Sequence, residues 1–142
     1  MMNKKHILII NGANLNLLGR REPSVYGSQD FASYLEELRK EFTDCTIDYF
    51  QSNIEGEIVN SLQNFKGDAI IINAGGYSHT SVVIRDAIAA IDTLCIEVHI
   101  SNIYAREKFR HESLLSAVCG GTITGFGLSG YKMAVYYVIC SM

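Results

Sequence analysis

The chain has 142 residues, of which 48% are hydrophobic and 19% are charged, and its formal net charge is −3. This length fits one domain spanning residues 1–142, and the apolar content excludes an intrinsically disordered chain. A nucleic-acid-binding domain normally carries a basic surplus, so the acidic balance disfavours a nucleic-acid partner.

The cysteines and the apolar runs indicate the cellular setting. Four widely spaced cysteines (Cys45, Cys95, Cys119, Cys140) form no C-x-x-C pair, so we expect buried free thiols rather than structural zinc or disulfides. The basic N-terminus precedes an apolar run too short for a secretory signal, and no run approaches the ~18–20 residues that cross a membrane. We therefore expect a soluble, cytoplasmic protein without a membrane partner.

Short apolar runs alternate along the chain with segments of helical period. We expect strands at residues 6–11, 45–51, 68–73, 94–99 and, with a weaker pattern, 121–124. We expect helices at residues 31–42, 54–65, 80–91, 105–112 and 132–140, the first one capped by Asp30 or Ser28. The continuous run Ile70, Ile71, Ile72 is typical of a strand that is covered on both faces.

This alternation predicts the α/β class, with a doubly wound parallel sheet and helices on both faces. Five strands in a chain of this length favour the flavodoxin-like order 2-1-3-4-5. The segments at 80–91 and 132–140 are apolar nearly all round, which indicates burial between layers or between subunits.

Polar side chains gather where the expected strands end. They are Asn11 and Asn14; Gln51, Ser52 and Asn53; Asn73 and His79; and His99 and Ser101. In doubly wound sheets, ligands bind beyond the carboxyl ends of the strands. We therefore expect these groups to converge on one site.

The connection after the first strand is long. Residues 12–29 show no helical or strand period, and the part at about 19–28 holds Arg21, Pro23 and Tyr26 between two glycines. Loops beyond ~12–15 residues in compact domains are usually lids or disordered segments. A lid that closes over an anionic ligand and a solvated loop both fit this composition.

Two histidines follow neighbouring strands. A lone histidine is more often structural, but His79 and His99 at adjacent strand ends favour a functional site. Glu97 precedes His99 by two residues, so the two side chains share one side of the strand. A carboxylate there would orient the imidazole and keep it protonated for general-acid catalysis. We expect no metal, because no tight set of ligating residues has the required spacing.

Arg106 and Arg110 are four residues apart and would share one face of the helix expected at 105–112. Two guanidinium groups on one face suit a carboxylate or a phosphate. The alternative is a solvated basic face paired with Glu107 and Glu112. Together with Arg21 from the expected lid, the two arginines would form a cationic site in an acidic chain.

Tyr26 is an unusual candidate for a catalytic base. A free tyrosine is a poor base at neutral pH, but a neighbouring cation favours its phenolate form. Arg21 lies five residues earlier in the same loop and is available for this role.

The stretch from Gly125 to Gly130 matches the pattern G-x-G-x-x-G. A dinucleotide site also needs a following βα unit and an acidic residue about 20 positions further on, and this sequence holds neither. We therefore interpret these glycines as turn and close-packing residues and expect no cofactor.

Several blocks together resemble the type II 3-dehydroquinate dehydratases. They are NGANLNLLG at 11–19, REP at 21–23, YG at 26–27, QSN at 51–53, EG at 55–56, NAGGYSHTS at 73–81, RDA at 85–87, EVHISN at 97–102, ARE at 105–107 and FR at 109–110. The resemblance runs through nearly the whole chain. It implies a flavodoxin-like subunit in a homo-oligomer, a dodecamer of four trimers.

The resemblance also implies the reaction, the removal of water from 3-dehydroquinate to give 3-dehydroshikimate. This reaction belongs to the shikimate pathway of aromatic amino acid biosynthesis, and the alternative is quinate breakdown. Such an enzyme is a hydro-lyase that works by anti elimination through an enolate, without a Schiff base or a metal. The small-molecule substrate would be the ligand of the site.

Positions that match the family's motifs imply the following roles. Tyr26 is the base that removes the C2 proton, and Arg21 holds it as phenolate and closes the lid. His99 protonates the departing C1 hydroxyl and Glu97 orients it, while Asn14 and Asn73 fix an ordered water or polar network that stabilises the enolate. The residues that bind substrate are His79, Ile100, Ser101 and Arg110, with Arg106 meeting Tyr26 and Asp86 reaching a neighbouring subunit's site.

Two other classes of function remain as alternatives. A flavodoxin-like binding or regulatory module would carry a bound chromophore or an acidic phospho-acceptor cluster, but Asn11 and Asn14 stand at the end of the first strand. An NAD-dependent enzyme would depend on the incomplete glycine pattern alone.

Overall fold

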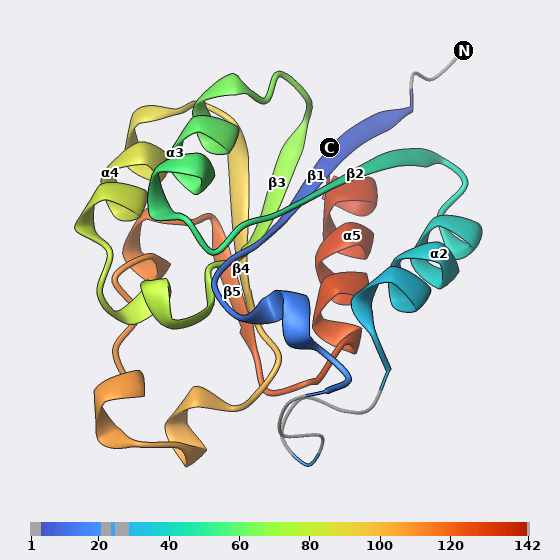
Figure 1. Cartoon of the computed structure of the whole chain (residues 1–142). Coiled ribbons are helices and arrows are strands. Elements are labelled where there is room, and N and C mark those ends of the chain that lie inside the picture. Colours follow the sequence, from blue (N-terminus) through green and yellow to red (C-terminus); the bar gives the residue numbers. More distant parts are fainter. Residues whose placement is uncertain (1–3, 21–23, 25–28, 142) are drawn as a thin grey trace.

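The computed structural model describes residues 4–20, 24 and 29–141. Five parallel strands form one sheet in the order β2-β1-β3-β4-β5, as predicted from the sequence (Figure 1). The strands are β1 (Lys5–Asn11), β2 (Cys45–Gln51), β3 (Ala69–Asn73), β4 (Leu94–His99) and β5 (Gly121–Thr124). The helices are α2 (Phe31–Glu41), α3 (Glu55–Asn64), α4 (Val82–Ala90) and α5 (Ser129–Ser141). The 3₁₀ turns are η1 (Leu15–Leu17), η2 (Gly75–His79), η3 (Ile103–Ala105), η4 (Lys108–Arg110) and η5 (Ser116–Val118).

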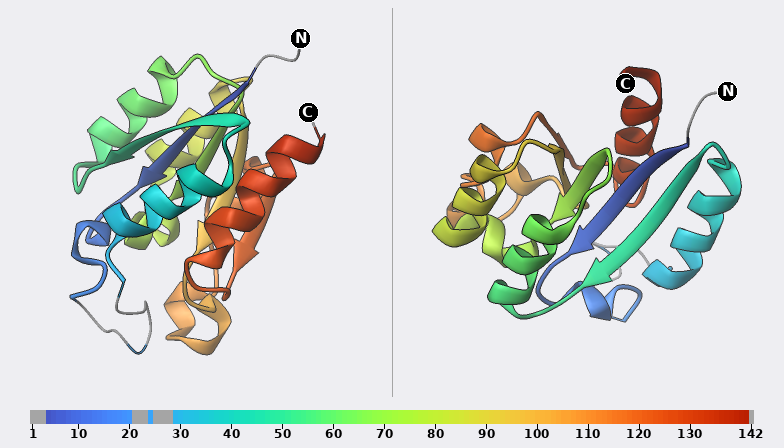
Figure 2. Two further views of the ribbon diagram at one scale, coloured as in Figure 1. Left: turned by 90° about the vertical axis from the view of Figure 1, so that its right-hand side faces the viewer. Right: turned by 90° about the horizontal axis from the view of Figure 1, so that it is seen from above.

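Helices cover both faces of the sheet, with α2 and α5 on one side and α3 and α4 on the other (Figure 2). Alternate residues of each central strand enter opposite cores, because successive side chains of a strand point to opposite faces. Thus Ile71 packs with α2 and α5, whereas Ile70 and Ile72 pack with α3 and α4. The continuous apolar pattern of β3 follows from this double coverage, and all five of its residues are buried.

The strand register aligns the carboxyl ends of the central strands. Asn11, the last residue of β1, lies opposite Gln51 on β2 and Asn73 on β3. His99 ends β4 opposite Thr124 on β5. The polar groups that follow the strands therefore meet at one edge of the sheet, which is the placement that the sequence predicted.

Two helix caps explain where α2 and α4 begin. The side chain of Asp30 accepts a hydrogen bond from the Ser33 amide at 2.8 Å, so Asp30 caps α2. Ser81 caps α4 in the same way, through the Ile84 amide at 3.0 Å. The first of these caps is one of the two residues proposed from the sequence.

The prediction of a helix at residues 105–112 is wrong, because the chain forms η3 and η4 there with extended backbone between them. In an α-helix the Arg106 carbonyl would accept the amide of Arg110. Instead it lies 3.0 Å from Nε2 of His111, and the Arg110 amide bonds the Glu107 carbonyl at 2.8 Å. A side chain thus competes with the helical backbone bond and leaves only 3₁₀ turns.

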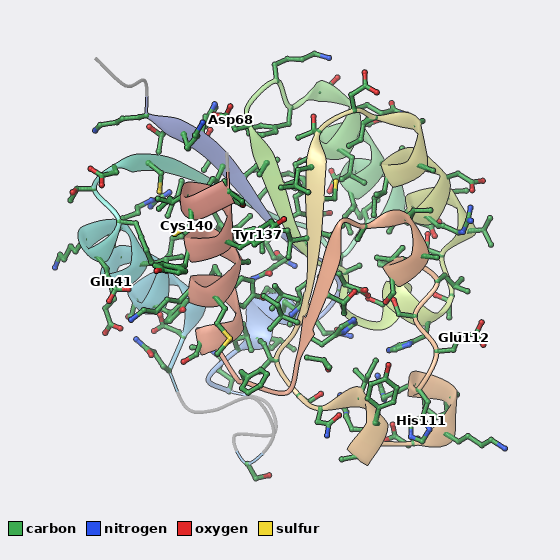
Figure 3. The ribbon with its side chains drawn as sticks, turned by 180° about the vertical axis from the view of Figure 1, so that it is seen from behind. Glu41, Asp68, His111, Glu112, Tyr137 and Cys140 are labelled. Atoms are coloured by element: carbon green, nitrogen blue, oxygen red, sulfur yellow. The ribbon has the colours of Figure 1, made fainter. Side chains whose placement is uncertain are left out.

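Apolar side chains remain on the surface of two helices. On α4, Val82 is 57% exposed and Val83 is 52% exposed, and on α5 Tyr136 and Tyr137 are also exposed (Figure 3). These are the segments whose nearly uniform apolar character indicated burial between layers or subunits. Each helix buries one face on the sheet and leaves apolar groups on the other.

Two of the expectations about cysteines and membranes are tested by the structure. All four cysteines are free, but the expectation that they are buried is wrong for Cys140, which is exposed near the end of α5, and Cys119 is only half-buried. Burial raises the pKa of the Cys95 thiol to about 12. Within the described ranges 4–20, 24 and 29–141, no helix is long and apolar enough to cross a membrane.

Candidate active site

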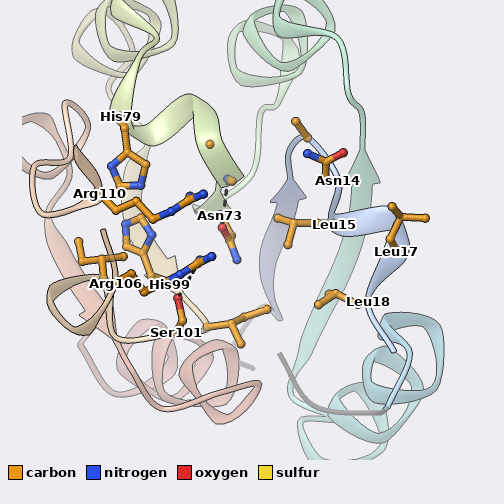
Figure 4. A pocket seen from close by; sticks show the side chains of 15 residues that line it. Asn14, Leu15, Leu17, Leu18, Asn73, His79, His99, Ser101, Arg106 and Arg110 are labelled. Carbon is orange, nitrogen blue, oxygen red and sulfur yellow. Dashed lines mark hydrogen bonds between the residues drawn. The ribbon is translucent and has the colours of Figure 1, made fainter. Parts of the chain in front are cut away.

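A pocket opens at the carboxyl edge of the sheet, where three segments from distant parts of the sequence meet (Figure 4). The segment after β1 contributes one wall, η2 after β3 contributes the second, and the connection after β4 contributes the third. The lining residues are Ala13, Asn14, Leu15, Leu17, Leu18, Asn73, Gly75, Gly76, His79, His99, Ile100, Ser101, Ile103, Arg106 and Arg110. Eight of the twelve site residues predicted from the sequence are in this set.

The floor of the pocket requires two glycines, because the segments after β1 and β3 cross at close range. A Cβ on Gly12 would lie 2.3 Å from the Ala74 carbonyl oxygen, well inside van der Waals contact. Gly75 has φ +65°, and a Cβ there would lie 2.7 Å from the Ala13 carbonyl oxygen. These crossings bring the ends of β1 and β3 together under the site.

Asn14 adopts a left-handed conformation with φ 70°, which is uncommon for a residue other than glycine. Its amide donates to Oδ1 of Asn53 at 2.9 Å. Nε2 of Gln51 donates to the same oxygen and to the Gly12 carbonyl, each at 3.2 Å. The polar residues after β2 therefore support the pocket wall from behind rather than line it.

Glu97 and His99 form a buried pair. Nε2 of His99 lies 2.6 Å from Oε2 of Glu97, and the side chains are 6% and 0% exposed. Burial opposes the charge on Glu97, but hydrogen bonds and the charge of His99 outweigh it and lower the pKa of that carboxyl to about 2. Glu97 is therefore ionised at neutral pH.

Hydrogen bonds to acceptors fix one ring nitrogen in each pocket histidine. A carboxylate can only accept, so Nε2 of His99 carries the proton in its bond to Glu97. Nδ1 of His79 lies 2.8 Å from the Glu112 carbonyl oxygen and carries a proton for the same reason. The two rings stack with centroids 6.1 Å apart, and both side chains enter the pocket (Figure 4).

Arg106 and Arg110 both direct their guanidinium groups into the pocket, although no α-helix carries them (Figure 4). Arg106 donates to Oγ of Ser101 at 3.4 Å, and Nε of Arg110 donates to Glu107. Among the described lining residues there is no acidic side chain. The pocket is thus cationic within a net acidic chain, and it suits an anionic ligand.

Asn73 is held by a buried network that the sequence did not suggest. Its Nδ2 donates to the Tyr131 hydroxyl at 3.0 Å, and its Oδ1 accepts from the Gly75 amide at 3.2 Å. The same hydroxyl donates to Oδ1 of Asn11 at 2.7 Å, and Nδ2 of Asn11 donates to Tyr49 at 3.3 Å. The orientation of the pocket amide is therefore fixed from inside the core.

The structure does not place three of the predicted site residues in the pocket. Asp86 is exposed on α4 beside Arg85, with its Oδ1 3.1 Å from the arginine, and does not line the pocket of its own chain. Arg21 and Tyr26 lie outside the described residues, as does most of the segment expected to form a lid.

The glycine pattern at 125–130 has the role that the sequence indicated. Gly125 and Gly127 have φ values of +96° and +62°, and a Cβ on Gly125 would crowd Asn102 at 3.1 Å. Their amides donate to the carbonyls of His99 and Ile100, at 3.2 and 2.9 Å. These donors serve the end of β4.

Sequence reasoning missed the hydroxyl groups that surround Glu97. Ser113 donates to its Oε2, while Ser116 and Thr122 donate to its Oε1. A serine is common in loops, so nothing in the sequence distinguishes these residues from solvated ones. The available signal was the charge of Glu97 itself, because a buried carboxylate requires several donors.

The described residues hold no group of three or more His, Cys, Asp or Glu side chains able to bind a metal ion. What they do present is a doubly wound α/β protein whose cationic pocket is lined by a histidine that a buried carboxylate holds. The comparisons with known proteins agree with this class. The family described as dehydroquinase class II matches residues 5–139, so the chain belongs to that family.

Relatives and solved structures extend the similarity over almost the whole chain. A 3-dehydroquinate dehydratase from Exiguobacterium sp. is 52% identical over 135 residues, which cover 94% of this chain and 93% of that protein. One from Campylobacter jejuni is 51% identical over 137 residues, covering 94% and 86%. The crystal structure of type II dehydroquinase from Butyrivibrio crossotus has a TM-score of 0.91 at 41% identity, covering 96% of this chain and 98% of that one.

Proposed function

We propose that this protein dehydrates 3-dehydroquinate to 3-dehydroshikimate, the reaction for which its relatives are named, as a step of the shikimate pathway. The observation that carries the proposal is the pair formed by Glu97 and His99 beside two arginines in one pocket. Such a site offers a proton donor next to cations. The substrate has what these groups would act on, a leaving hydroxyl and a carboxylate.

The carboxylate and the hydroxyls of the substrate bind to the wall that follows β4. Arg110 supplies a planar cation that matches a carboxylate, and the backbone amides of Ile100 and Ser101 supply neutral donors. His79 binds a substrate hydroxyl through Nε2, because its Nδ1 is engaged with the Glu112 carbonyl. These contacts hold the ring with its reacting carbons towards His99 and Asn73.

The elimination is anti and proceeds in two steps: the proton on C2 and the hydroxyl on C1 leave from opposite faces of the ring. The Tyr26 phenolate removes the C2 proton, and the electron pair moves into the C3 carbonyl as an enolate. Asn14 and Asn73 hold the polar network that stabilises the developing negative charge. The enolate then expels the C1 hydroxyl, which takes a proton from His99 and leaves as water.

The family resemblance assigns the base side of this reaction. Tyr26 and Arg21 belong to the segment expected as a lid, and Arg106 lines the pocket. A phenolate is a competent base near neutral pH only beside cations, which Arg21 and Arg106 provide. Before the next turnover, Tyr26 must lose its proton and His99 must regain one.

We further propose that the chain assembles into a dodecamer of four trimers. The exposed apolar groups of α4 and α5 support subunit contacts, since exposed apolar patches mark association surfaces. Asp86 is exposed on α4, and the family resemblance implies that in this assembly it reaches a neighbouring subunit's site. Light scattering of the purified protein should give twelve times the chain mass, and a monomer would contradict the assembly.

A direct assay tests the reaction. Purified protein mixed with 3-dehydroquinate should generate the ultraviolet absorbance of the conjugated product without added metal or cofactor. Borohydride added with substrate should leave the activity intact, because no imine forms. No turnover would refute the proposed function, and inactivation by borohydride would refute the mechanism.

Two variants test the assigned chemistry. His99→Gln and Tyr26→Phe should each lower kcat by at least roughly a hundredfold, the range lost with a general acid or base. Tyr104→Phe is the matched control, since it removes a hydroxyl from an exposed tyrosine that does not line the pocket. Full activity in Tyr26→Phe would remove that residue as the base.

A further inference from the structure

We propose that Ser113 and Ser116 are positioning residues, whose hydroxyls clamp Glu97 so that His99 presents a fixed ring to the substrate. The expected effect on kcat rests on the proposed function, whereas the expected effect on the His99 ring rests only on the contacts of Glu97. Neither serine lines the pocket, so both act through Glu97.

The clamp engages both oxygens of the carboxylate. Oε2 accepts from His99 and Ser113, and Oε1 accepts from Ser116 and, at 3.1 Å, from Thr122. Four donors fill the acceptor capacity of an ionised carboxylate. Because each oxygen has two partners, the group cannot rotate without breaking bonds to at least two of them.

Glu97 needs this clamp because its side chain is fully buried. A buried charge with missing partners is costly, and it relieves the cost by taking up a proton or by moving towards water. Either change would weaken the bond to Nε2 of His99. The ring would then turn more freely, and the proton donor would no longer hold one position relative to the leaving group.

Residues 112–116, the segment that carries the two serines, also hold the second pocket histidine, by an independent contact. The Glu112 carbonyl binds Nδ1 of His79, and the Leu114 amide donates to the Ser78 carbonyl at 2.8 Å. Leu115 anchors the segment in the core, where it is fully buried. His79 depends on backbone atoms of this segment, whereas His99 depends on serine side chains.

This difference provides an internal control. Replacing the two serines by alanine removes the hydroxyls around Glu97 but leaves the backbone contacts of His79 in place. The ring of His99 should respond and the ring of His79 should not. Local unfolding of the segment would change both rings together.

The test is the double variant Ser113→Ala/Ser116→Ala, compared with Ser113→Thr/Ser116→Thr, which restores the hydroxyls. Ser61→Ala, on α3, is the matched control for loss of a half-buried serine hydroxyl. Long-range proton–nitrogen spectra of the histidine rings report the Nε2–H bond of His99. The same proteins are assayed for kcat and KM with 3-dehydroquinate.

We expect the alanine variant to lose the His99 Nε2–H signature while that of His79 stays unchanged. Its kcat should fall roughly 10- to 100-fold, the usual effect of removing a partner that orients a reacting group, with KM altered less than about threefold. The threonine variant should recover most of both signals.

An unchanged His99 spectrum with full kcat in the alanine variant would overturn the proposal, and so would changes in both histidines without recovery by threonine. If the double variant does not fold, Ser116→Ala alone carries the same readouts, because Glu97 keeps three donors. An inactive wild-type protein would refute the proposed function, whereas the His99 spectra would still decide whether the serines position the ring.

Discussion

Removing the hydroxyl of Tyr131 should destabilise the protein, although phenylalanine fills the same space. The ring is fully buried and packs edge-on against Phe31, with centroids 4.9 Å apart, and Tyr131→Phe preserves this contact. What the substitution removes is the hydroxyl between Nδ2 of Asn73 and Oδ1 of Asn11. Both amides are themselves buried.

The magnitude follows from the groups left without this partner. A buried donor or acceptor that loses its partner costs about 1–3 kcal/mol, and here one of each loses it. The hydroxyl no longer has to be desolvated on folding, and Asn73 borders the pocket, where water can reach its amide. We therefore expect a net loss of about 2 kcal/mol, or about 6–8 °C in Tm for a chain of this length.

Thermal unfolding followed by circular dichroism measures this loss, with all proteins at one concentration because assembly shifts Tm. Tyr34→Phe is the control. The Tyr34 hydroxyl is buried in the same aromatic cluster without a hydrogen-bond partner among the described residues, although the Lys132 backbone faces it. Its removal should change stability by less than about 0.5 kcal/mol. If the two variants unfolded at the same temperature, the Asn11–Tyr131–Asn73 network would contribute nothing to stability.

Three further substitutions test other parts of the structure. The pKa of Glu97 is lowered to about 2 from 4.5, which stabilises the fold above pH 4.5, and this stability is lost as the pH falls towards 2. In Glu97→Gln the midpoint of urea unfolding should therefore depend less on pH across this range. An unchanged pH dependence would contradict the lowered pKa. Arg110→Gln should raise KM roughly tenfold or more. The control Lys108→Gln lies on the same turn but outside the pocket, and it should leave KM unchanged. Equal KM values in the two variants would exclude Arg110 from substrate binding. Gly12→Ala should prevent stable folding, because a Cβ there would meet the backbone of Ala74. The control Gly56→Ala has open space around it on α3, and in urea titrations it should be neutral or stabilising by up to about 1 kcal/mol. A stable Gly12→Ala protein would refute the close crossing.

The strands could be predicted because their apolar runs are set by burial on both faces. Strand β3 is the clearest case, since Ile70 and Ile72 enter one core and Ile71 the other. The order of the sheet followed from the alternation with helices, and the polar residues at the strand ends then placed the pocket. Glu97 and His99 could be paired because a strand puts residues two apart on one side.

The segment at 105–112 could not be predicted by period alone. The spacing of Arg106 and Arg110 is helical, but a ring nitrogen of His111 occupies the carbonyl that a helix would have used. Both arginines still reach the pocket, so the prediction that they share one site is correct although the predicted helix is not. Such competition between a side chain and the backbone has no periodic signature in the sequence.

The hydrogen-bond partners of the site residues were hidden for another reason, their distance along the chain. Tyr131 lies 120 residues from Asn11 and 58 from Asn73, and nothing in its local sequence links it to either. The apolar pattern of α5 predicts that the ring of Tyr131 is buried, which is correct, but it does not predict a hydrogen-bond partner for the hydroxyl. Only the folded arrangement shows that a core helix orients a pocket amide.

The two sides of the pocket are therefore held by different kinds of interaction, and they should tolerate substitution differently. The side of His99 and Asn73 is fixed by buried hydroxyls and amides, where loss of one partner leaves another group unsatisfied. The side of Arg106 and Arg110 is carried by short 3₁₀ turns with exposed residues between them. Substitutions around the first side should alter kcat and stability together, because catalysis and folding depend on the same bonds. Substitutions of Arg110 on the second side should act mainly on KM, because the proposed role of this arginine is to bind the substrate carboxylate and its turn contributes little of the core.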